Sequence, residues 1–181
     1  LYTSGTTSAP KGVAIRHSNS AMIITSEPKW TGRPWLHACP MFTFSGMTFV
    51  YQPMRMGMYT LYLPTFDTGE WLSLIESARP KSVFLVPAMV ELLIADERTA
   101  KTDWSSVEMV SVGSAPIAPT TLLAMQDIVP DAMVTNSYSM TEAGTAYFFM
   151  PKGELVKHPG SVGLAVPPAK VRILSDDGED V

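Results

Sequence analysis

The sequence has 181 residues and a formal net charge of −4, with 46% hydrophobic and 17% charged residues, which is the composition of a globular domain and not of a disordered chain. No basic run or tail is present, which argues against nucleic acid as a partner, and the single Cys39 excludes an internal disulfide and a cysteine-rich metal site. The longest apolar stretch, 82–95, is too short for a transmembrane segment, and no export leader is visible, so we expect a cytoplasmic protein.

The chain opens with a strand-like stretch, 1–3, that runs at once into small hydroxylated residues, glycine and then Lys11. Backbone N–H groups of such a turn can converge on an anion, and a helix that begins beyond it adds its positive end. The residues that suit phosphate binding are Thr3, Ser4, Gly5, Thr6, Thr7 and Lys11. A polar loop without a ligand is the alternative. A Walker loop is a poor match, because glycine and not Ser or Thr follows the lysine.

Strand-like and helix-like segments alternate from residue 34 onward. Short runs rich in β-branched and aromatic residues predict strands at 34–38, 59–63, 82–86, 108–112 and 132–136. Helices are predicted between them, one capped by Asp67 or Thr68 with Trp71, Leu74, Ile75 and Ala78 on one face. Pro87 and Pro119 suit the first turns of two more, carrying Met89, Leu92 and Leu93, and Leu122, Met125 and Val129.

The pattern changes after residue 141, where 146–150 and 169–174 resemble strands, the second with one face in water. Alternating strands and helices imply βα units and a largely parallel sheet. We therefore expect one α/β domain, with a largely parallel sheet flanked by helices and a smaller β-rich C-terminal tail.

The stretch YTSGTTSAPKGV, 2–13, closely resembles the phosphate loop of the adenylate-forming superfamily, which contains acyl-CoA synthetases, luciferases and peptide-synthetase adenylation domains. Four later segments resemble further motifs of this superfamily and occur in the same order. They are CPMFTFSGM (39–47), VGSAP (112–116), NSYSMTE (136–142) and GSVGLAVP (160–167). Together these segments cover nearly the whole chain.

The resemblance implies a nucleotide site. Adenine is expected between the ring of Tyr138 and the small residues Gly113, Ser114 and Ala115, with Asn136 and Ser137 beside it. Thr141 is expected to donate to the α-phosphate, and Glu142 to ligate the Mg²⁺ that accompanies ATP. Lys11, Thr141 and Glu142 are the residues expected to act in catalysis.

The implied reaction is ATP-dependent activation of a carboxylic acid to an acyl-adenylate and then to a coenzyme A thioester. The sequence of these segments resembles that of fatty-acyl-CoA ligases most, which suggests a fatty acid as the substrate. Residues 1–181 are expected to be the central part of the AMP-binding domain, with the ribose-binding aspartate and the C-terminal lysine beyond Val181.

Three positions depart from the superfamily pattern. Ser8 and Ser139 stand where glycine is usual, and Thr43 stands where many acyl-CoA synthetases have histidine. A divergent, non-catalytic nucleotide-binding module is therefore an alternative. A methionine- and aromatic-rich stretch could line an acyl pocket, although a packed core is the more common use of such residues: Phe42, Phe44, Met47, Phe49, Met54, Met56 and Met58.

Overall fold

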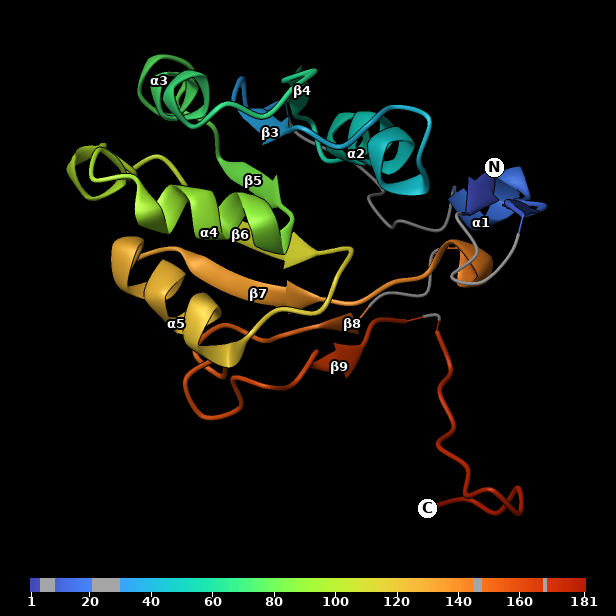
Figure 1. The fold of residues 1–181 in the computed structure, drawn as a ribbon. Helices are drawn as coiled ribbons and strands as arrows, with labels where there is room; N and C mark the ends of the chain where they lie inside the picture. The colour runs from blue at the N-terminus through green and yellow to red at the C-terminus, as the bar shows by residue number, and fades with distance from the viewer. Residues whose placement is uncertain (4–8, 21–29, 145–147, 168) are drawn as a thin grey trace.

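The computed structural model describes residues 1–3, 9–144, except 21–29, and 148–181, except 168. Its centre is a five-stranded parallel sheet in the order β4-β3-β5-β6-β7 (Figure 1). The five strands are β3 (Pro34–His37), β4 (Tyr59–Tyr62), β5 (Ser82–Leu85), β6 (Met109–Gly113) and β7 (Met133–Ser137). All five predicted strands are confirmed, to within one residue at each end.

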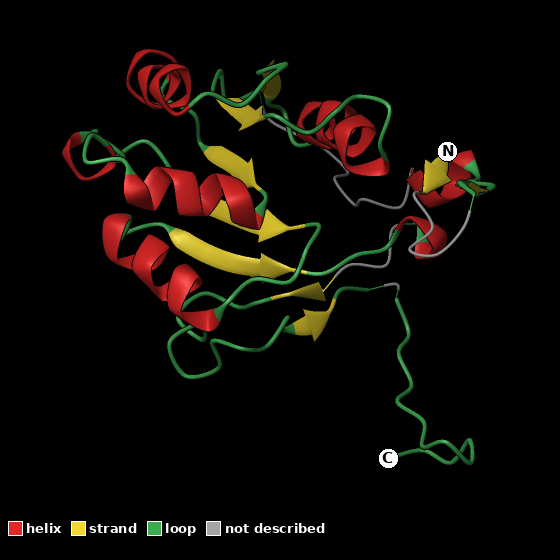
Figure 2. Ribbon diagram, viewed as in Figure 1, coloured by secondary structure: helices red, strands yellow, loops and turns green. Residues whose placement is uncertain are grey.

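Four helices connect these strands (Figure 2). They are α2 (Phe44–Arg55), α3 (Thr68–Ala78), α4 (Pro87–Ala95) and α5 (Pro119–Ile128). The strand order turns back once, since the chain passes from β3 to β4 on one side and then to β5, β6 and β7 on the other. Because crossovers between parallel strands are right-handed, α2 lies on one face of the sheet and the other three helices lie on the opposite face.

The larger core lies between the sheet and α3, α4 and α5. It contains Trp71 and Ile75 of α3 and Leu93 of α4, all fully buried against strand residues such as Val83 and Val110. The helix predicted to be capped by Asp67 or Thr68 is α3, and Asp67 is its N-cap. The Asp67 carboxylate accepts a hydrogen bond from the Glu70 N–H at 2.9 Å.

The buried face predicted for α4 was partly wrong. Leu92 is 55% exposed, and Val90 is the residue buried beside Leu93. Helix α4 is apolar on nearly all sides, so spacing alone did not identify which residues face the sheet.

The second core lies under α2, where Phe49 packs against Trp35 and Phe84. The methionine- and aromatic-rich stretch divides here, because Phe44, Phe49 and Met58 are buried whereas Phe42 and Met54 are 80% and 65% exposed. The buried members serve as packed core, which was the more common of the two uses expected.

The remaining elements are short. They are β1 (Tyr2–Thr3), β2 (Lys11–Gly12), α1 (His17–Ser20), β8 (Phe148–Phe149), β9 (Leu164–Ala165) and the 3-10 turns η1 (Thr99–Lys101) and η2 (Thr141–Ala143). The predicted strand at 169–174 was wrong. That segment is a loop that leaves the body of the molecule, with Val171 and Ile173 exposed and only an isolated bridge from Leu174 to Asp180. Alternation alone did not make a strand, because no described strand lies beside it to form a ladder.

Candidate nucleotide site

The candidate site lies at the carboxyl edge of the sheet, where β6 and β7 end side by side. Gly113 and Ser137 are paired across these two strands, so the VGSAP and NSYSMTE segments leave the sheet at the same place. A Cβ atom added to Gly113 would lie 2.6 Å from the Ser137 carbonyl oxygen. Only glycine lets the two strand ends approach this closely.

Ser114 follows with a φ of 72°, in the left-handed region that ordinary residues rarely adopt. Ser114 and Ala115 are exposed, so this turn presents small groups to solvent beyond the strand ends. The described non-glycine residues with positive φ are Arg79 and Ser114. Ser139 therefore has ordinary backbone geometry, and its replacement of the usual glycine brings no left-handed strain.

Tyr138 lies one residue beyond β7 and is 47% exposed. Its ring meets Phe148 edge to face, with centroids 5.5 Å apart, and its carbonyl accepts a hydrogen bond from the Phe148 N–H at 2.9 Å. Phe148 therefore packs against the tyrosine ring, part of which stays accessible. A half-exposed aromatic ring held by a neighbour is suited to stacking on a flat base.

Asn136 and Ser137 make contacts within the protein. The Asn136 side-chain N–H donates to the Ser161 carbonyl at 3.3 Å, and the Ser137 and Ser111 hydroxyls lie 2.7 Å apart. Ser161 was not among the predicted site residues. The GSVGLAVP segment was the available signal for it, and the hydrogen bond shows that this segment reaches the same edge of the sheet.

The N-terminal hairpin, formed by β1 and β2, lies beside η2, the turn that follows β7. The Thr3 hydroxyl donates to Glu142 Oε1 at 3.2 Å, and Lys11 is the direct partner of Thr3 in the antiparallel pair of β1 and β2. Figure 1 shows the N-terminal hairpin next to η2. Thr141 is half-buried and Glu142 is exposed. Among the described residues no ion pair joins Lys11 to Glu142, and Ser4, Gly5, Thr6 and Thr7 lie outside the described residues, as does Ser8.

The donor set at η2 fits Mg²⁺ carried by a nucleotide. Mg²⁺ prefers oxygen ligands and is commonly held by one or two carboxylates together with phosphate oxygens. Glu142 offers an exposed carboxylate beside the hydroxyl of Thr3, and Thr141 precedes it in the same turn. In the described ranges no group of three or more His, Cys, Asp or Glu residues could hold a metal by itself. Glu142 is therefore the residue that would hold the ion, and the ion would supply positive charge to the phosphates.

Two side chains near the carboxyl end of β3 are unsuited to acid–base or nucleophilic chemistry. Burial lowers the pKa of His37 to about 4 and raises the pKa of the Cys39 thiol to about 12, so both are uncharged at neutral pH. The Thr43 hydroxyl donates to the Pro40 carbonyl at 2.7 Å and accepts from the Gly46 N–H at 3.0 Å, which caps α2. The departure at position 43 thus has a structural use.

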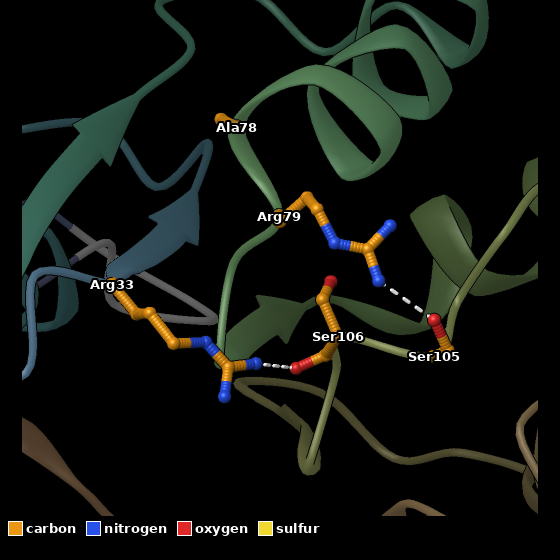
Figure 3. Close-up of a pocket in the computed structure, with 5 residues that line it drawn as sticks. All are labelled: Arg33, Ala78, Arg79, Ser105 and Ser106. Atoms are coloured by element: carbon orange, nitrogen blue, oxygen red, sulfur yellow. Dashed lines mark hydrogen bonds between the residues drawn. The ribbon is translucent and has the colours of Figure 1, made fainter.

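A shallow pocket lies at the opposite, amino edge of the sheet and is lined by Arg33, Ala78, Arg79, Ser105 and Ser106 (Figure 3). Arg79 donates to Asp103 and to the Ser105 hydroxyl, both at 2.7 Å. Arg33 donates to Glu108 at 2.8 Å and to the Ser106 carbonyl. Both guanidinium groups are thus engaged by the protein, so this pocket is a poor candidate for an anionic ligand.

A doubly wound parallel sheet with glycine, hydroxyl and aromatic groups at its carboxyl edge defines a nucleotide-binding α/β protein. The AMP-binding enzyme family matches residues 1–181, and the chain belongs to this family.

No described helix is long and apolar enough to cross a membrane.

Relatives with assigned names include Acyl-CoA synthetase 7 of Caenorhabditis elegans, 30% identical over 98% of this chain and 35% of the relative. The indoleacetate–CoA ligase of Aromatoleum aromaticum is 31% identical over 99% of this chain and 36% of its own length. The chain therefore spans about a third of the length of these relatives, which are acid–CoA ligases by name.

Solved structures agree on the fold. The N-terminal domain of FACL13 from Mycobacterium tuberculosis superimposes with a TM-score of 0.84 at 25% identity, covering 99% of this chain and 46% of that one. The amide bond synthetase McbA from Marinactinospora thermotolerans gives a TM-score of 0.87 at 24% identity, covering 99% of this chain and 37% of that one. The predicted α/β class is thus confirmed.

Proposed function

We propose that this chain is the central part of an AMP-forming acid–thiol ligase, which activates a carboxylic acid with ATP and transfers the acyl group to coenzyme A. The observation that carries the proposal is the hydrogen bond from Thr3 to Glu142, at 3.2 Å. It brings the edge of the glycine-rich loop to the turn that follows Tyr138. One nucleotide can then meet both segments, with its base at Tyr138 and its phosphates at the loop.

In the proposed first step, a carboxylate oxygen attacks the α-phosphorus of ATP, and the bond from that phosphorus to the bridging oxygen of the β-phosphate breaks. Two anions must approach each other, so the site must supply positive charge and donors. Lys11 and the loop N–H groups are assigned to the departing pyrophosphate, Thr141 to the α-phosphate and Glu142 to Mg²⁺. In the second step the thiol sulfur of coenzyme A attacks the acyl carbon, and AMP leaves.

A fatty acid is the first substrate we propose, from the resemblance of the sequence to fatty-acyl-CoA ligases. The relatives carry names that span other acids, including indoleacetate, 4-coumarate and 2-succinylbenzoate. The ribose-binding aspartate and the C-terminal lysine remain predictions for sequence outside residues 1–181, as does a cytoplasmic location.

The test is ATP–pyrophosphate exchange by the full-length protein with a panel of medium- and long-chain fatty acids, indoleacetate and 4-coumarate. We expect exchange with at least one acid, and a loss of about a hundredfold in Glu142→Gln, because one charge-stabilising group in a reaction site is worth about 3 kcal/mol. Glu91→Gln is the matched control, because it makes the same change at an exposed position of α4. ATP binding without exchange for any acid would instead favour a non-catalytic nucleotide-binding module.

A further inference from the structure

We draw no further inference here: the strongest candidate, the pocket at the amino edge of the sheet lined by Arg33, Arg79 and Ser106, carries nothing, because the protein itself engages both guanidinium groups and buries the Ser106 hydroxyl out of reach of a ligand.

Discussion

At the amino edge of the sheet, Glu108 is shared between Arg33 and Lys81, whereas at the carboxyl edge the partner of Glu142 among the described residues is one neutral hydroxyl, that of Thr3. The amino edge neutralises its charges within the protein and ties the loop before β6 to the starts of β3 and β5. The carboxyl edge carries Gly113 at a close backbone approach and Ser114 in a left-handed conformation. The close backbone approach and the exposed polar groups without a charged partner among the described residues lie at the carboxyl edge, which is where a parallel sheet binds its ligands.

The largest effect we predict is a loss of stability in acid, which should begin at a higher pH for His37, at the carboxyl edge, than for Glu108, at the amino edge. His37, at the carboxyl end of β3, has its pKa lowered by burial from 6.5 to about 4, so the native state favours the uncharged ring. As pH falls from 6.5 to 4 the unfolded state takes up a proton that the native state does not. Stability should therefore fall by up to about 3 kcal/mol across this window, at 1.36 kcal/mol for each pKa unit.

Urea unfolding between pH 7 and 4, followed by tryptophan fluorescence, measures this loss. His37→Phe keeps an aromatic ring against Phe49 and Tyr62 and should flatten the profile in this window. Glu108 changes stability in the same direction but in a lower pH window, because burial raises its pKa while hydrogen bonds and charge from Lys81 and Arg33 outweigh burial and hold the pKa below 4.5. Its contribution is present above pH 4.5 and is lost only as pH falls further. A profile that is as steep in His37→Phe as in the natural protein would refute the assignment.

The next largest effect on stability should come from adding a side chain at Gly113, where β6 and β7 approach each other closely. The Cβ atom of Gly113→Ala would lie 2.6 Å from the Ser137 carbonyl oxygen, so backbone must move. We expect a loss of about 2 kcal/mol in the free energy of unfolding, typical of overpacking. Gly12→Ala is the control, since its Cβ atom would meet Tyr2 at an ordinary 3.6 Å and should change stability by less than about 0.5 kcal/mol. Equal effects of the two substitutions would contradict this account.

The sequence allowed good prediction where local pattern and packing agree. The five central strands and α3 are examples, because short β-rich runs and the Asp67 cap indicate the same structure that tertiary packing selects. Helix α2 was not predicted. It contains Gly46, Thr48 and Pro53, which have low helix propensity, and it is held by the Thr43 cap and by burial of Phe49.

The candidate site was predictable only in part. Motif order placed Gly113 and Tyr138 near one another, because parallel strands β6 and β7 end at the same edge. The contact between Thr3 and Glu142 could not be read from spacing, since it depends on how a separate hairpin packs against η2. The use of Thr43 as a helix cap was missed for a similar reason, because the helix itself was not expected.

The smallest effect concerns the non-glycine residues with positive φ, of which the described part of the chain has one at each edge of the sheet, Arg79 and Ser114. Ser114→Gly removes the steric penalty of a φ of 72°, which is about 1 kcal/mol, but adds conformational entropy to the unfolded chain. We expect a net gain of about 0.5 kcal/mol in the free energy of unfolding. Arg79→Gly relieves a similar conformation at φ 49° but loses the hydrogen bonds to Asp103 and Ser105, so no net gain is expected there. Urea unfolding of both variants in parallel tests the contrast. The same gain in both would mean that the polar contacts of Arg79 contribute nothing, and that the two edges differ less than their geometry indicates.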